Sequence, residues 1–140
     1  LIWAITKKNP FKKKPLLSLK KRIALSKKIT NGNKKIKIKS YDKKLKSSKT
    51  IDLIRFFKKN KNNNKYYFLI GSDNLVGLHK WKNWREINKF CQIAVFPRKG
   101  YVKKSLNSPA FKHLGLQNLL ILKSKMFNIS SSKLRKNYLK

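Results

Sequence analysis

The sequence predicts an α/β domain built on a parallel sheet, and three observations support this fold class. Short apolar runs alternate along the chain with amphipathic segments, the order expected of strands and crossover helices. The run at residues 66–70 is almost continuously apolar and ends at Gly71, which is typical of a buried parallel strand. With 140 residues, 40% of them hydrophobic, the chain suffices for one domain with a real core and leaves no room for two.

The expected strands are short and bounded by turn-prone residues. Residues 1–6 form an apolar first strand, and Ile36 and Ile38 alternate with lysines, which predicts a strand exposed on one face and near a sheet edge. The run at 66–70 is the best candidate for a central strand. Further strands are expected at 92–96, ended by Pro97, and at 118–122.

Apolar residues at helical spacing predict helices between these strands. A stripe from Leu16 to Ile29 carries lysines on its other face and stops at the turn-prone residues 31–33. A second helix is expected over 50–59, where the Thr50 hydroxyl is suited to cap the first turn. Short helices are expected at 84–90 and 130–135, and a mixed loop after Pro97.

The charge balance implies that the chain attracts anions. Its 38 basic residues face only four acidic ones, for a formal net charge of +34. Nearly all of the basic residues are lysines, which are hydrated point charges, whereas arginine makes the bidentate contacts typical of specific phosphate and base recognition. We interpret the excess mainly as a solvated surface, and a dedicated nucleic-acid surface remains the alternative.

Cysteine usage and hydropathy exclude several other classes of protein. Cys91 is the only cysteine, which excludes an internal disulfide framework and a Cys-rich zinc site and fits a reducing cytoplasm. The longest apolar stretches fall far short of the ~20 residues of a membrane span. We therefore expect a cytoplasmic protein with no membrane partner.

Polar residues that suit a nucleotide follow the strand at 66–70. Gly71 would let a ligand approach the backbone beyond the strand, and Asp73 could accept a hydrogen bond from a ribose hydroxyl. The alternative is a glycine turn with a capping aspartate.

Two further segments have features of a ligand site. Trp81 could stack on an aromatic ring of a ligand or lie in the core. Trp84 follows three residues later and would share its helix face. Trp84 and Ile87 are interpreted as core residues. The serines at 130–132 and Arg135 would converge on a helix N-terminus, an arrangement suited to phosphate. An ordinary serine cap is the alternative there.

In this order and spacing, these segments resemble the bacterial nicotinate-nucleotide adenylyltransferases of the HxGH nucleotidyltransferase superfamily. GSDNL at 71–75 and HKWKNWREI at 79–87 are similar to the family's strand end and tryptophan segment, and ISSSKLR at 129–135 resembles the superfamily's ISSTxxR signature. Weaker matches are NPFK at 9–12, SKTID at 48–52 and FPRKGY at 96–101, which resemble the NPxK, SYTxD and RPGY segments.

The resemblance implies a Rossmann-like parallel sheet with helices on both faces and a role in NAD biosynthesis. The implied reaction transfers AMP from ATP, accompanied by Mg²⁺, to nicotinate mononucleotide, giving nicotinate adenine dinucleotide and pyrophosphate. The family's first, central strand and its GxFDPxHxGH loop have no counterpart here. The resemblance thus implies a single domain over residues 1–140 that is truncated at its N-terminus, and His79 and His113 are assigned no catalytic role.

Position by position, the resemblance implies two groups of binding residues. Nicotinate mononucleotide would be bound by Thr50, Trp81 and Lys12. ATP would be bound by Gly71 and Asp73 near the ribose, by Ser131, Ser132 and Arg135 at the phosphates, and by Arg98 as a further basic contact. The sequence departs from the family at three positions: Lys49 replaces a tyrosine, Leu53 a frequent threonine and Ser132 the signature threonine.

Two alternatives remain open at the level of sequence. One is a related nucleotidyltransferase with another phosphorylated acceptor, such as phosphopantetheine or glycerol phosphate, against which Trp81 and the GSDNL context argue. The other is a basic RNA-binding or ribosome-associated protein, which the charge favours. Salt distinguishes the latter, because nucleic-acid binding weakens steeply with ionic strength whereas ring stacking does not.

Overall fold

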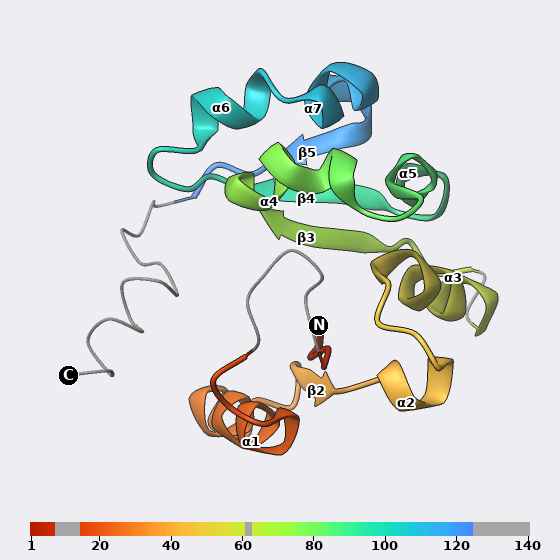
Figure 1. Cartoon of the computed structure of the whole chain (residues 1–140), viewed down its shortest axis with the longest axis vertical. Coiled ribbons are helices and arrows are strands. Elements are labelled where there is room, and N and C mark those ends of the chain that lie inside the picture. Colours follow the sequence, from red (N-terminus) through yellow and green to blue (C-terminus); the bar gives the residue numbers. More distant parts are fainter. Residues whose placement is uncertain (8–14, 61–62, 125–140) are drawn as a thin grey trace. The chain divides into compact units, whose positions relative to one another are not determined.

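The computed structural model describes residues 1–7, 15–60 and 63–124 and divides into two compact units, 1–59 and 60–140 (Figure 1). Each unit contains parallel strands and helices, which confirms the predicted α/β class. The prediction of one domain over the whole chain stays a prediction. In the parts of the chain that are described, no helix is both long and apolar enough to cross a membrane.

The first unit contains a two-stranded parallel sheet and three helices. Strand β1 (Ile2–Ala4) pairs with β2 (Lys37–Lys39), with Trp3 opposite Ile38. The helices are α1 (Leu19–Ile29), α2 (Asp42–Leu45) and α3 (Thr50–Asn60). Ile38 is buried and its lysine neighbours are exposed, so the alternation seen in the sequence does mark a strand with one solvated face.

Helix α1 illustrates how local chemistry sets the boundaries. Ser18 is its N-cap and its side chain accepts a hydrogen bond from the Lys21 backbone N–H at 3.2 Å. Lys27 and Lys28 lie in the last turn, where positive charge suits the helix dipole. The helix therefore begins three residues later than the apolar stripe at Leu16 predicted.

The second unit contains a three-stranded parallel sheet in the order β3-β4-β5. The strands are β3 (Tyr67–Gly71), β4 (Gln92–Phe96) and β5 (Leu119–Ile121). The helical segments are α4 (Ser72–Gly77), α5 (Ile87–Phe90), α6 (Val102–Leu106) and α7 (Pro109–Leu114), with short 3-10 turns η1 (Leu78–Lys80), η2 (Trp84–Glu86) and η3 (Leu116–Asn118).

One face of this sheet carries the core of the second unit. Both crossovers, from β3 to β4 and from β4 to β5, lead in the same direction across the sheet, so right-handed connections place their helices on one face. The side chains that alternate toward that face, Ile70, Ile93 and Val95, are buried, as are Leu75 and Leu78 from the helical layer. On the opposite face Leu69 and Leu120 are about 40% exposed.

Three expectations about local structure were wrong. The strand at 66–70 was expected to be buried, yet Tyr67 and Leu69 of β3 are exposed; β3 is an edge strand of the described sheet, and its central place in a longer sheet stays a prediction. Trp81 and Trp84 do not share a helix, because Trp81 ends η1 and Trp84 begins η2 after a turn in which Asn83 has a positive φ. The expected mixed loop contains α6 and α7.

Candidate functional site

The ends of β3 and β4 bring together residues that are distant in sequence. The parallel register pairs Gly71 with Phe96, so Asp73 and Arg98 each lie two residues beyond the ends of neighbouring strands. This is the carboxyl edge of the sheet, where α/β proteins bind their ligands. Two of the ATP-binding residues implied by the resemblance are therefore neighbours in the structure.

Asp73 and Arg98 form a short, partly buried ion pair. Arg98 Nη1 donates to Asp73 Oδ2 at 2.5 Å, and the two side chains are 34% and 20% exposed respectively. The Arg98 backbone N–H also donates to Ser72 Oγ at 2.9 Å. Two contacts thus link the residue after β4 to the first turn after β3, and Ser72 is a member of this cluster that sequence reasoning missed.

Gly71 makes room for this carboxylate. A Cβ at residue 71 would stand 2.4 Å from Asp73 Oδ1, closer than any side chain tolerates. The backbone of Gly71 is extended, with a φ of −81°, so the glycine is needed for space and not for its conformational freedom. Asp73 Oδ1 itself is shielded from water and has no hydrogen-bond partner.

The tryptophan segment begins one turn beyond α4. Trp81 is partly exposed, and its ring meets the Phe68 ring in an edge-on geometry with centroids 6.1 Å apart. Trp84 is buried and contacts the His113 ring edge-on at 5.0 Å, while the Arg85 guanidinium lies 4.9 Å from the Trp84 ring centroid. The interpretation of Trp84 as a core residue is confirmed, and stacking by Trp81 stays a prediction.

The two histidines have packed environments that suit structural roles. His113 contacts Trp84 from the last turn of α7. His79 lies in η1, and its Nδ1 atom is buried without a hydrogen-bond partner. That neither histidine is catalytic stays a prediction.

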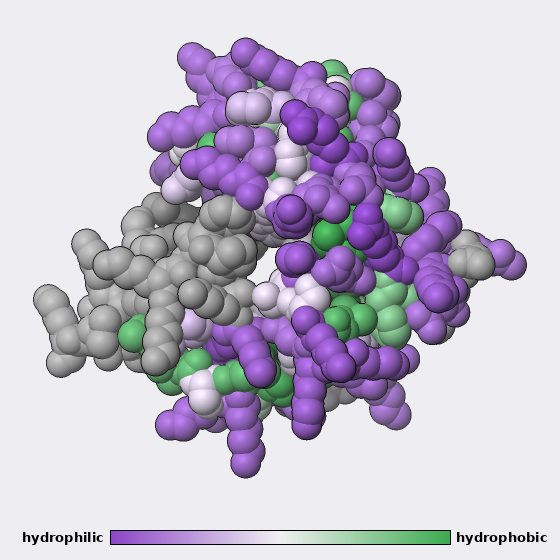
Figure 2. All heavy atoms as spheres, turned by 45° about the vertical axis from the view of Figure 1, so that its right-hand side comes forward, coloured by the Kyte–Doolittle hydropathy of each residue, from purple (hydrophilic) through white to green (hydrophobic). Residues whose placement is uncertain are grey.

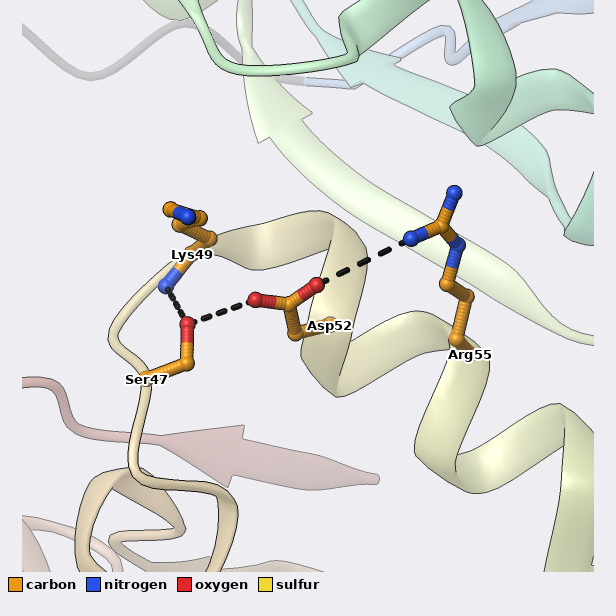
Figure 3. A network of polar contacts seen from close by, with 4 residues as sticks. All are labelled: Ser47, Lys49, Asp52 and Arg55. Carbon is orange, nitrogen blue, oxygen red and sulfur yellow. Dashed lines mark hydrogen bonds and ion pairs between the residues drawn. The ribbon is translucent and has the colours of Figure 1, made fainter.

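In the first unit, Thr50 begins helix α3 behind an ordered turn (Figure 3). Ser47 Oγ accepts a hydrogen bond from the Lys49 backbone N–H at 3.1 Å and donates one to Asp52 Oδ2 at 2.6 Å. Asp52 Oδ1 lies 3.9 Å from Arg55 Nη1, one turn further along the helix. Ser47 was missed by sequence reasoning, because its contact with Asp52 lies five residues along the chain and follows no standard capping pattern.

A second polar contact in the first unit fixes the chain just after β1. The Lys7 backbone N–H donates to Asp42 Oδ2 at 2.6 Å, and the Lys7 carbonyl accepts from Arg22 Nη2 at 2.9 Å. Charged side chains thus bind both the N–H and the C=O of Lys7. Each of the three aspartates of the chain has a contact of 2.6 Å or less.

Hydrophilic side chains cover most of the face that Figure 2 shows. Cys91 contributes no reactive thiolate at neutral pH, because burial raises its pKa from 9.0 to about 11, against a smaller lowering effect of a hydrogen bond with the Phe68 backbone.

Several residues implied by the resemblance lie outside the described parts of the chain. These are Lys12, Ser131, Ser132 and Arg135. Thr50 and Trp81 are described, but in separate units. Within residues 1–7, 15–60 and 63–124, no group of three or more His, Cys, Asp or Glu side chains could hold a metal ion.

Comparisons with known proteins identify the family of the chain. The cytidylyltransferase-like family matches residues 1–137. A "probable nicotinate-nucleotide adenylyltransferase" of Pelagibacter ubique is 47% identical over 136 residues, which are 97% of this chain and 75% of that protein. One of the same description from Rhizobium meliloti is 34% identical over 78% of this chain and 58% of its own length.

Among solved structures, the nicotinic acid mononucleotide adenylyltransferase of Plasmodium falciparum complexed with NaAD has a TM-score of 0.70. It is 22% identical, and the match covers 96% of this chain and 67% of that one. This likeness confirms the Rossmann-like α/β fold. The chain belongs to the cytidylyltransferase-like family and, within it, to the nicotinate-nucleotide adenylyltransferases.

Proposed function

We propose that the protein transfers the AMP part of ATP to nicotinate mononucleotide. A phosphate oxygen of the mononucleotide attacks the α-phosphorus of ATP, a new P–O bond forms, and pyrophosphate leaves with the electrons of the broken bond. The products are nicotinate adenine dinucleotide and pyrophosphate. The observation that carries the proposal is the Asp73–Arg98 pair beside Gly71, at the sheet edge where a nucleotide binds, in a chain 47% identical to an adenylyltransferase.

The proposal concerns the activity of the whole protein. The chain spans 75% of the first relative and 58% of the second, so the residues named here are its share of the site. The resemblance assigns the stabilisation of the transferring phosphate partly to histidines that have no counterpart in residues 1–140. Rate acceleration in such a transfer comes from positioning the substrates and neutralising charge, without a covalent enzyme intermediate.

The described residues bind and orient in this proposal. Trp81, held at its edge by Phe68, offers a partly exposed ring for stacking on the nicotinate. Thr50 lies at the start of helix α3, behind a turn in which Ser47 and Asp52 are hydrogen-bonded, and its assignment to the mononucleotide rests on the motif resemblance.

Lys12, Ser131, Ser132 and Arg135 are proposed to bind phosphates on the strength of the motifs alone. Mg²⁺ is proposed to arrive with ATP and to neutralise its phosphate oxygens, because Mg²⁺ is commonly bound by substrate phosphates with few protein ligands.

Substitution of Trp81 tests the assignment of the two substrates. Trp81→Ala is expected to weaken nicotinate mononucleotide binding by ~1–3 kcal/mol, the value of a lost base-type stack, and to leave ATP binding nearly unchanged. Trp81→Phe, which keeps an aromatic face, is the matched control and should retain most of the affinity. Equal losses for both substrates in Trp81→Ala would contradict the stacking role.

The net charge of +34 favours polyanion binding as a second candidate function. Binding to RNA should then weaken steeply between 50 and 200 mM salt, by about 10³-fold or more where six or more phosphates are neutralised. Stacking of the mononucleotide on Trp81 should not change in this way. RNA binding that competes with ATP for the same site would favour the second candidate.

A further inference from the structure

We propose that helix α1 binds the phosphate backbone of duplex DNA through one lysine-covered face. This lysine face consists of Lys20, Lys21, Lys27 and Lys28, with Ala24 between them. It lies within the first unit and includes no residue assigned to the transfer of AMP. DNA binding is therefore a second function, separate from the reaction proposed above.

The periodicity of α1 gathers the four lysines on its solvent side (Figure 1). At 3.6 residues per turn, residues seven apart lie almost directly above one another, about 10.5 Å along the axis. Lys20 and Lys27 therefore form one row, and Lys21 and Lys28 form a second row about 100° around the helix. All four lysines are exposed, whereas Ser26, on the opposite side of the helix, is buried.

The acidic residues of the first unit are bound to other partners. Residues 1–59 carry 21 of the 38 basic residues of the chain but only two of its four acidic ones. Asp42 accepts a hydrogen bond from the Lys7 backbone N–H, and Asp52 accepts one from Ser47 and lies 3.9 Å from Arg55. The sequence of α1 contains no acidic residue, so the lysine face creates a positive potential that attracts polyanions.

The two lysine rows suit a groove that is bordered by two phosphate strands. An α-helix with its side chains is about 10–12 Å across, and the major groove of B-DNA is about 12 Å wide. Ala24 is small and exposed between the rows, so the helix can approach the groove while one row of lysines reaches each border. The major groove of duplex RNA is too narrow for this arrangement, which selects DNA.

The contacts of this surface are with phosphates. Ammonium groups bind phosphates as point charges and obtain no sequence information from them. Each lysine that neutralises a phosphate releases condensed counterions, so the affinity for DNA should fall steeply as the salt concentration rises. The dependence of affinity on salt therefore counts the lysines that take part.

The test follows the binding of a fluorescent DNA duplex of mixed sequence to the full-length protein, by anisotropy at increasing salt. One variant replaces all four residues of the lysine face with glutamine. The slope of log K against log salt should then become shallower by about 3–4, at ~0.9 for each phosphate contact. The affinity at about 0.1 M salt should fall at least 100-fold.

A control variant loses the same charge from the second unit. It replaces four exposed lysines of α5, α6 and α7 with glutamine, namely Lys89, Lys103, Lys104 and Lys112. Its slope should change by less than about one, because these lysines do not form two rows on one helix. Equal changes of slope in the two variants would mean that the charge acts diffusely and would overturn the proposal, as would an unsubstituted protein that does not bind the duplex at about 50 mM salt.

Other nucleic acids test the assignment to duplex DNA. Neutralising the lysine face should weaken binding of a single-stranded oligothymidylate and of an RNA duplex less than about tenfold, because neither offers the groove that the two rows fit. A loss as large as that for duplex DNA would show that the groove is not used, and the assignment to DNA would be wrong.

A smaller substitution keeps the test decisive if the fourfold variant does not fold. Lys20→Gln with Lys27→Gln neutralises one row and should lower the slope by about two, whereas Lys103→Gln with Lys112→Gln should leave it nearly unchanged. Formation of nicotinate adenine dinucleotide should be the same in all folded variants. Its loss in the variant without the lysine face would contradict a separate DNA surface, while its absence from the unsubstituted protein would overturn the proposed reaction and leave DNA binding intact.

Discussion

The close approach of the Asp73 carboxylate to Gly71 predicts how Gly71→Ala changes the free energy of unfolding. The substitution should destabilise the protein when Asp73 is present and should not destabilise it when Asp73 is replaced by alanine. In Gly71→Ala the new Cβ would stand 2.4 Å from Asp73 Oδ1, so the carboxylate must leave its place and its contact with Arg98. A charge-assisted hydrogen bond stabilises by ~1.5–3 kcal/mol. We reduce this to about 1–2 kcal/mol, since the arginine side chain is 34% exposed and solvent screens the pair.

The backbone itself accepts alanine at this position. Because φ is −81°, an alanine can adopt this backbone conformation without strain. Taken alone, Gly71→Ala should raise the free energy of unfolding by ~0.4–1 kcal/mol, since alanine lowers the conformational entropy of the unfolded chain. The net expectation is a loss of about 1 kcal/mol in the free energy of unfolding. In an Asp73→Ala background no carboxylate is displaced, so the same substitution should be neutral or stabilising by about 0.5 kcal/mol.

Four proteins form a double-mutant cycle: the unsubstituted protein, Gly71→Ala, Asp73→Ala and the double variant. Urea denaturation of these four measures the coupling energy between positions 71 and 73 directly. The expected coupling energy between positions 71 and 73 is about 1–2 kcal/mol. Refutation would be a cost of Gly71→Ala that is equal in both backgrounds, which would mean that the carboxylate moves aside freely and that Arg98 does not hold it.

Three further predictions concern stability and reactivity. Ser47→Ala should lower the free energy of unfolding by about 1 kcal/mol through loss of the turn before α3, whereas Ser48→Ala, at an exposed serine, should be neutral by urea titration. With its pKa raised to about 11, Cys91 should react with iodoacetamide at pH 8 about 100-fold more slowly in the folded protein than in urea. Equal alkylation rates in the folded and the urea-unfolded protein would contradict the burial of this thiol. The contribution of the neutral thiol to the free energy of unfolding is fully present below pH 9.0 and is lost as pH rises through about 11. Leu75→Ala, at a fully buried side chain, should cost ~2–5 kcal/mol, and Leu116→Ala, at one 66% exposed, less than about 0.5 kcal/mol in the same assay.

Local patterns in the sequence predicted most strands and the larger helices. The strand at 92–96 has the predicted bounds, and α3 begins at Thr50 as expected. Helix α7 was missed because it is only six residues long, although Ser108 followed by Pro109, with Gly115 after the helix, is a complete set of start and stop signals. An apolar run indicates a strand with two apolar faces, but it does not show what covers each face, so the exposure of Tyr67 and Leu69 in β3 was not foreseen.

The candidate site was predicted as separate residues and not as a cluster. Asp73 and Arg98 are 25 residues apart, and only the register of β3 against β4 places them side by side. Ser72 and the unsatisfied Asp73 Oδ1 depend on side-chain geometry that no sequence pattern encodes. The functional roles of Thr50 and Trp81 rest on motif resemblance and stay predictions.

The most direct test of the account is the reaction itself. The full-length protein, incubated with ATP, Mg²⁺ and nicotinate mononucleotide, should release pyrophosphate and form nicotinate adenine dinucleotide in equal amounts, as measured by coupled phosphate detection and chromatography. Replacing nicotinate mononucleotide with phosphopantetheine or glycerol phosphate should abolish pyrophosphate release. Product formation from either of those acceptors, or none from nicotinate mononucleotide by a folded protein that binds ATP, would contradict the assignment.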